Sequence, residues 1–347
     1  MLRRKMYISI VLSFLFIFNS SCKKEKEGNN TQILEQKGPS HRGVSFVSPS
    51  NPTGPEDFEP IANLNANWTA IIPFGFIREN QSNVEYNLDW QWWGERDEGV
   101  IELCNQGHSK NIKIMLKPQI WLMNGAFTGD YNLDTEAQWL ALETSYYNYI
   151  LHFADLADSL GVEAYCIGTE FKNFIFKRPQ FWGNLIDSVR VHFKGEISYA
   201  GNWDSYQSFP FWSKLDFIGI DAYFPIDEGE TPSLQDCIQG WQSHFTSIKN
   251  HQKQINKPVV FTEYGYRSVN FCAKEPWNSE LGGVVNEQAQ KNAYEALYQV
   301  FWDEEWFDGG FLWKWFPNHT NAGGSSNNRF TPQNKLAEDL IRAKYGS

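Results

Sequence analysis

The feature that most constrains this chain is the alternation of short apolar segments with helical patterns. Eight segments rich in β-forming residues lie at 43–47, 68–77, 112–122, 163–171, 196–203, 215–226, 258–266 and 309–317. Amphipathic helical spacing separates most of them and is clearest at 136–161, 232–252 and 286–306. Strands that alternate with helices predict a parallel sheet, and eight repeats in one domain predict a closed (β/α)8 TIM barrel. The alternative, a doubly wound open sheet, usually carries GxGxxG after its first strand, and 43–55 lacks it.

The first 39 residues are not expected to belong to the barrel. Residues 1–21 combine the basic start MLRRK with an apolar run, and Cys22 follows the small residues NSS, a layout that resembles a bacterial lipoprotein signal. Cys22 would then be acylated and anchor the protein, although an ordinary signal peptide cut nearby is the alternative. Residues 22–39 are polar and predict a flexible tether, which leaves 40–347 for the barrel. We therefore expect an exported lipoprotein of the cell envelope, in the outer membrane or periplasm.

Charge and cysteine usage exclude several classes of partner. The formal net charge of −11 disfavours nucleic acid and anionic lipid, so membrane contact is expected only through the lipid anchor. The other four cysteines are widely spaced without a CxxC pair, and no HExxH occurs, so we expect neither a metal site nor a cofactor. Disulfide pairing cannot be derived from the spacing. We expect a monomer.

Two of the eight predicted strands end on a carboxylate. Strand four reads AYCIGTE and ends at Glu170, whereas strand seven reads PVVFTE and ends at Glu263. In a (β/α)8 barrel the carboxyl ends of the strands surround the mouth where active sites form. Simple alternation predicts that Glu170 shares its facing with Cys166 and Gly168, and that Glu263 shares its facing with Val259 and Phe261.

A pair of carboxylates at one barrel mouth, among aromatic residues, suits glycoside hydrolysis. A retaining mechanism requires a nucleophile and an acid/base about 5–5.5 Å apart. The ends of strands four and seven face each other across an eight-stranded barrel, which makes this separation reasonable. The competing interpretation is that each glutamate forms a salt bridge at the rim with Lys or Arg. Finding both acids at these two strand ends favours catalysis.

The two glutamate motifs, CIGTEF and VVFTEYGY, resemble those of the retaining glycoside hydrolases that carry their acids on barrel strands four and seven. Within that clan the chain resembles glycoside hydrolase family 113, whose members include β-1,4-mannanases, over residues 42–317. The resemblance implies that Glu170 is the acid/base and Glu263 the nucleophile. Most relatives in the wider clan have Asn before the acid/base, to bind the sugar 2-hydroxyl, whereas Thr169 stands here. Which residue replaces that contact stays open.

Other strand ends supply candidate substrate-binding residues. Lys117 could bind sugar hydroxyls, lower the pKa of a nearby carboxyl, or simply pair with a rim acid. By resemblance, Tyr223 would hydrogen-bond the nucleophile. Trp313 and Trp315 share a facing in simple alternation, and one of them would form the floor under the sugar. The full set of candidates is Lys117, Gln119, Asn202, Trp203, Asp221, Tyr223, Trp313 and Trp315.

These observations together predict a retaining glycoside hydrolase that cleaves a β-1,4-linked glycan with two glutamates, with β-mannan as the expected substrate. The same mechanism on glucan or xylan is the alternative within enzymes. A surface lipoprotein that binds glycan without cleaving it is the alternative outside enzymes. Both carboxylates are present, which favours the enzyme.

Overall fold

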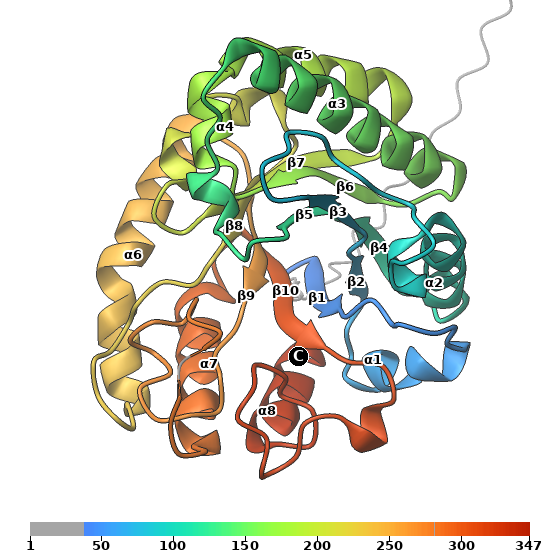
Figure 1. Cartoon of the computed structure of the whole chain (residues 1–347). Helices are drawn as coiled ribbons and strands as arrows, with labels where there is room; N and C mark the ends of the chain where they lie inside the picture. Colours follow the sequence, from blue (N-terminus) through green and yellow to red (C-terminus); the bar gives the residue numbers. More distant parts are fainter. Residues whose placement is uncertain (1–37, 281) are drawn as a thin grey trace, which may run out of the picture. The chain divides into compact units, whose positions relative to one another are not determined.

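Eight parallel strands close into a barrel in the computed structural model, which describes residues 38–280 and 282–347 (Figure 1). The barrel strands are β1 (His41–Phe46), β2 (Trp68–Ile71), β4 (Lys113–Leu116), β6 (Ala164–Thr169), β7 (Glu196–Asn202), β8 (Ile218–Asp221), β9 (Val259–Tyr264) and β10 (Phe307–Trp315). Their order around the barrel is β1-β10-β9-β8-β7-β6-β4-β2. The predicted (β/α)8 architecture is confirmed, and the open-sheet alternative is wrong. The predicted signal and Cys22 lie outside the described residues.

Helices surround the strands, as the sequence pattern predicts (Figure 1). They are α1 (Glu59–Asn63), α2 (Asp97–Ser109), α3 (Glu136–Ser159), α4 (Lys172–Lys177), α5 (Pro179–His192), α6 (Leu234–Ile255), α7 (Glu287–Phe301) and α8 (Leu336–Tyr345). Capping boxes fix the starts of the two longest, with Thr135 before α3 and Ser233 before α6. Within the described residues, no helix has both the length and the apolar character needed to cross a membrane.

Two of the predicted strands are interrupted by proline. Pro73 separates β2 from β3 (Phe74–Ile77), and Pro118 separates β4 from β5 (Gln119–Leu122). Because proline has no backbone N–H, it cannot donate in a continuous ladder, and the strands are divided at these points. Beyond the prolines, β3 and β5 pair in parallel as a separate two-stranded sheet. This sheet extends β2 and β4 beyond the carboxyl end of the barrel.

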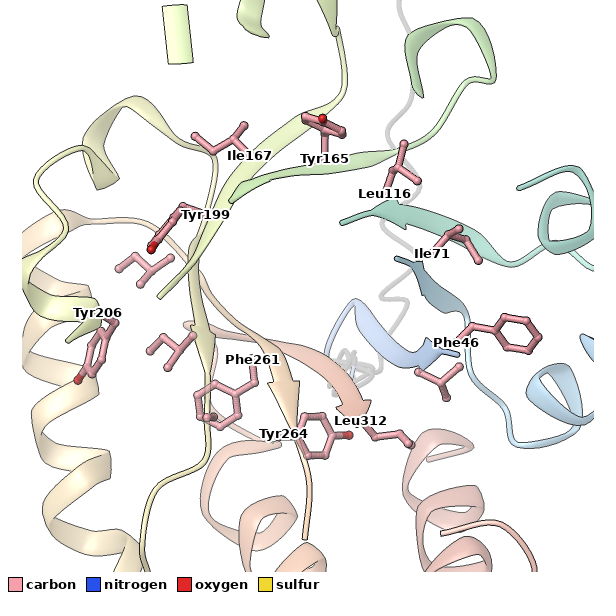
Figure 2. Close-up of a cluster of buried hydrophobic side chains, with 14 of the residues drawn as sticks. Phe46, Ile71, Leu116, Tyr165, Ile167, Tyr199, Tyr206, Phe261, Tyr264 and Leu312 are labelled. Atoms are coloured by element: carbon pink, nitrogen blue, oxygen red, sulfur yellow. The ribbon is translucent and has the colours of Figure 1, made fainter. Parts of the chain in front are cut away.

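The core has two layers because each barrel strand presents side chains to both faces. Side chains that point outward pack against the helices, and Figure 2 shows this layer at Phe46, Leu116 and Phe261, among others. A smaller cluster fills the barrel interior, formed by Trp68, Ala70, Ile72, Met115, Ala164, Phe217, Val260 and Phe311. The barrel is therefore packed rather than hollow, and the polar side chains at the strand ends are built on a rigid support.

Candidate active site

A β-bulge in β9 turns Glu263 into the barrel. Gly219 of β8 pairs with Val260, but two residues later Asp221 pairs with Glu263, so β9 contains one extra residue. Val260 belongs to the interior cluster and Phe261 to the outer layer. The prediction that Glu263 shares the facing of Phe261 is wrong, because the extra residue reverses the alternation.

A second bulge lies in β6, just before Glu170. Cys166 pairs with Ser198 and Thr169 with Ala200, so β6 advances three residues while β7 advances two. A Cβ added at Gly168 would lie 2.7 Å from side-chain atoms of Trp182 and Tyr146, in the outer layer. The predicted shared facing of Gly168 and Glu170 is therefore also wrong. Glu170 itself has a φ of 57°, in the left-handed region, which residues other than Gly and Asn adopt uncommonly.

Three donors converge on the Glu263 carboxylate. Lys117 Nζ donates to Oε1 at 2.5 Å, and Gln119 Nε2 donates to the same oxygen at 2.7 Å. Tyr223 Oη donates to Oε2 at 2.8 Å, which is the hydrogen bond expected for this tyrosine. Hydrogen bonds to the ionised form of a carboxyl stabilise it, and one of these donors also carries a positive charge.

Lys117 joins Glu263 to Asp221 beneath the mouth. Its ammonium lies 3.2 Å from Asp221 Oδ1, and both side chains have no exposed surface. Burial opposes the charge of Lys117, but Asp221 and Glu263 outweigh it and raise the lysine pKa. Burial and the charge of Glu263 raise the pKa of Asp221 to about 7, although Lys117 and the Thr262 hydroxyl act in the opposite direction. One ammonium shared by two carboxylates does not fully stabilise both.

The structure therefore changes the interpretation of two candidates. Lys117 and Asp221 were expected to touch substrate, yet neither has any side-chain surface with which to do so. Lys117 instead pairs with two acids, one of the alternatives left open by the sequence. Lys117 follows β4 and Asp221 ends β8, and the two buried side chains meet inside the barrel.

Glu170 has the opposite electrostatic environment to Glu263. Burial is the largest cause of a pKa well above the usual range for this carboxyl, and the charges of Asp221 and Glu263 raise the pKa further. Lys117 is the main group that opposes them. These causes favour the neutral form of Glu170, which lies near the hydrogen-bonded carboxylate of Glu263. A neutral carboxyl near a hydrogen-bonded carboxylate is an arrangement that can supply an acid and a base or nucleophile.

The family follows from comparison of the sequence with known families. The sequence profile of Glycoside Hydrolase Family 113 matches residues 49–335. The chain belongs to glycoside hydrolase family 113. The resemblance inferred from the two glutamate motifs is thereby confirmed. The protein is a glycoside hydrolase, and a polysaccharide or oligosaccharide is its class of substrate.

Solved structures share the barrel of this family 113 enzyme. The family 113 β-mannanase AaManA from Alicyclobacillus acidocaldarius, in complex with ManMIm, aligns with a TM-score of 0.78 at 23% identity, over 89% of this chain and 97% of that chain. A family 113 β-1,4-mannanase aligns at 0.77 and 23% identity, over 89% and 99%. A β-glucuronidase from Faecalibacterium prausnitzii aligns at 0.58 and 14% identity, over 90% of this chain and 51% of that chain. No curated protein sequence matches the chain.

The tryptophans at the end of β10 do not share a facing in the family 113 enzyme. Val44 pairs with Leu312 and Phe46 with Trp315, so β10 also carries an extra residue here. Trp313 packs against the interior cluster and is partly exposed, whereas Trp315 is completely buried in the outer layer. The expectation that either could lie under the sugar is corrected, because only Trp313 has surface at the mouth.

The end of β7 supplies a partly exposed pair. The side chain of Asn202 accepts a hydrogen bond from the backbone N–H of Trp203 at 2.9 Å, which fixes the turn after the strand. The Trp203 ring stacks on Trp277, with centroids 5.0 Å apart and an interplanar angle of 19°. Asn202 and Trp203 both keep surface toward solvent, and a sugar contact for them stays a prediction.

A cavity of about 440 Å³ lies on the β1 and β10 side of the mouth, and its lining includes neither Glu170 nor Glu263. Trp313 and Lys314 line the part of it nearest the site. Burial lowers the pKa of Lys314, and the charge of Glu263 acts in the opposite direction. Trp90, Trp92 and Glu95 line its outer part. The sequence interpretation missed this part, although the run DWQWWGE at 89–95 is an unusual density of tryptophan for a loop.

The cysteines of the described chain form no disulfide, and its His, Cys, Asp and Glu side chains form no metal-binding cluster. Cys104, Cys166, Cys237 and Cys272 are all buried free thiols, so the open question of disulfide pairing is answered for the described chain. Residues 38–280 and 282–347 contain no group of three or more His, Cys, Asp or Glu side chains placed to hold a metal ion.

Proposed function

We propose that the protein is a retaining β-glycosidase in which Glu263 is the nucleophile and Glu170 the acid/base. The observation that carries the proposal is the convergence of Lys117, Gln119 and Tyr223 on the Glu263 carboxylate. Such a carboxylate can attack the anomeric carbon while the protonated Glu170 gives its proton to the departing glycosidic oxygen. The products of this step are a glycosyl ester on Glu263 and a leaving group that carries a hydroxyl.

The electrostatic environment of Glu170 supports its change of role in the second step. The charge of Glu263 is one of the causes that raise the pKa of Glu170. Once Glu263 is esterified it is neutral, so this contribution disappears and the pKa of Glu170 falls. Glu170 can then accept a proton from water, whose oxygen attacks the anomeric carbon and releases Glu263 as a carboxylate. The sugar thus keeps its anomeric configuration.

The proposed substrate is β-1,4-linked mannan. Two family 113 structures that share this barrel are β-mannanases, and the alignment covers nearly the whole length of each. The partly exposed Trp313 at the mouth supports a pyranose substrate, because sugar C–H faces pack well on indole rings. Glucan and xylan are the competing β-glycans, and binding without cleavage is the competing function.

Incubation of the purified enzyme with β-mannan, β-glucan and xylan tests the proposal. We expect mannan alone to yield oligosaccharides, and NMR of the first product to show the β-anomer before mutarotation. Glu170→Gln and Glu263→Gln serve as the matched inactive controls. The α-anomer as first product would exclude retention, whereas preferred cleavage of glucan or xylan would change only the substrate. Binding of mannan without any cleavage would favour the non-catalytic function.

A further inference from the structure

One face of the β3–β5 sheet connects the candidate nucleophile to the outer part of the cavity. Gln119, which donates to Glu263, and Trp121 lie two residues apart on β5 and therefore share a face. Phe74 and Phe76 pair with them in register on β3. At about 3.3 Å per residue, Trp121 lies roughly 7 Å further along the strand than Gln119. Trp121 is 54% exposed although it lines the cavity.

Trp90 of the neighbouring loop is also exposed but is held in place. The Trp90 ring contacts Phe76 with centroids 4.8 Å apart, and the Arg78 guanidinium lies 5.6 Å from its centroid on the ring face. Gln91 Nε2 donates to the Phe74 carbonyl at 2.8 Å and so ties the loop to β3. Trp90 and Trp92 nevertheless remain 47% and 52% exposed. Clustered, immobilised and exposed aromatic rings are typical of a ligand surface.

Glu95 adds a polar group to this apolar surface. It lies at the end of a short 3-10 helix (Trp93–Glu95), is buried, and lines the cavity. No Lys, Arg or His of the described chain lies within ion-pair distance of it, and burial raises its pKa, although bonds from Gln91 and the Trp92 backbone oppose this. A carboxyl group can accept hydrogen bonds from two neighbouring sugar hydroxyls. The mechanism proposed above does not use it.

We propose that Trp121, Trp90 and Glu95 form an accessory binding site for the pyranose units of the glycan beyond the unit that is cleaved. The two indoles provide surfaces on which sugar rings stack, and Glu95 binds hydroxyl groups of the same segment. The inference rests on the proposed function for the class of glycan. It concerns the binding of further sugar units of the chain, not the chemical step.

Binding to a cleavage-deficient variant tests this site separately from catalysis. In the Glu170→Gln background, the Kd of mannohexaose is measured by calorimetry, with cellohexaose and xylohexaose as further probes. We expect Trp121→Ala and Trp90→Ala each to raise the Kd of the bound hexasaccharide about tenfold, and Glu95→Gln about three- to tenfold. Val191→Ala and Glu305→Gln, which alter exposed residues outside the cavity, should change it less than about twofold.

Hydrolysis of a short substrate in the otherwise wild-type enzyme completes the test. A dinitrophenyl β-mannoside does not reach the accessory site, so the three cavity variants should hydrolyse it at nearly the wild-type rate. Equal losses of activity on the short substrate and on the hexasaccharide would overturn the inference. It would also be overturned if the hexasaccharide Kd were unchanged in all three variants, or if the protein bound none of the hexasaccharides. If the wild type cleaves nothing but the variants lose binding, the accessory site stands and the proposed catalytic function falls.

Discussion

The ammonium of Lys117 lies 2.5 Å from Oε1 of Glu263, and neither side chain has more than a small exposed surface. The two residues are far apart in the sequence and come from opposite parts of the barrel, β4 and β9. A buried ion pair loses much of its hydration, so its contribution to stability depends on how completely its remaining hydrogen bonds are formed. Here Lys117 also donates to Asp221, while Gln119 donates to the same Oε1 of Glu263 and Tyr223 donates to Oε2.

Replacement of Lys117 by Met should nearly abolish activity. Two buried carboxylates would remain without their shared cation, and one of them would take up a proton. We expect kcat/KM to fall at least about 100-fold, with the acidic side of the pH profile moved to higher pH. Steady-state kinetics between pH 4 and 9 measure both effects. Lys177→Met, at an exposed site, is the control, and a wild-type profile for Lys117→Met would refute the role of this pair.

The two glutamates should differ in chemical rescue. Azide should restore turnover of Glu263→Ala with an inverted glycosyl azide, because the anion attacks the substrate directly from the open side. Glu170→Ala should still form the glycosyl-enzyme from a dinitrophenyl glycoside, whose leaving group needs no proton, and azide should then give the retained product. NMR of the products distinguishes the two. An inverted azide from Glu170→Ala would exchange the proposed roles.

Asp221→Asn should move the basic side of the pH–rate profile to lower pH. The charge of Asp221 is the second largest cause of the raised pKa of Glu170, and Asp204 is a smaller one. Removing the Asp221 charge lowers the pKa of the acid, so Glu170 loses its proton at lower pH. The pH dependence of kcat/KM measures the shift. Asp204→Asn is the matched control and should give a smaller shift in the same direction; equal profiles for wild type and Asp221→Asn would contradict this.

The same substitution should alter the pH dependence of stability. The pKa of Asp221 is raised to about 7 in the folded protein, so its favourable contribution is present below the unfolded pKa of about 4 and is lost as pH rises through 7. Asn does not titrate. Between pH 4.5 and 8 the free energy of unfolding of Asp221→Asn, relative to wild type, should rise by on the order of 1–4 kcal/mol. Thermal unfolding at several pH values tests this, and a constant difference would show that Asp221 does not titrate in this range.

Membrane attachment is predicted to depend on Cys22. If the start of the chain is a lipoprotein signal, Cys22→Ser should release the protein from the membrane fraction of cells, because the acyl chains are lost. Fractionation with labelled palmitate measures both attachment and acylation. Unchanged fractionation together with an unlabelled wild type would indicate an ordinary secretory signal. Cys104→Ser, at a buried thiol of α2, is the matched control and should keep the label.

The sequence by itself determined the barrel and the two strand ends that carry its acids. Strand and helix periods are local properties, since each follows from which neighbouring residues are apolar, and the two acids are adjacent to such runs. The motifs around Glu170 and Glu263 were sufficient to indicate the family. The hydrogen bond of Tyr223 to Glu263 also agrees with what the resemblance implied.

Only the tertiary structure decided which way the acids face. A one-residue bulge reverses every later side chain of a strand, and whether it forms depends on the register with both neighbouring strands, which lie 40 or more residues away in β8 and β10. The same cause buried Trp315 and exposed Trp313. Lys117 and Asp221 form an ion pair instead of binding sugar because the residue after β4 and the last residue of β8 meet inside the closed barrel. The depth of a side chain in a closed barrel is a property of the whole sheet, and no local pattern encodes it.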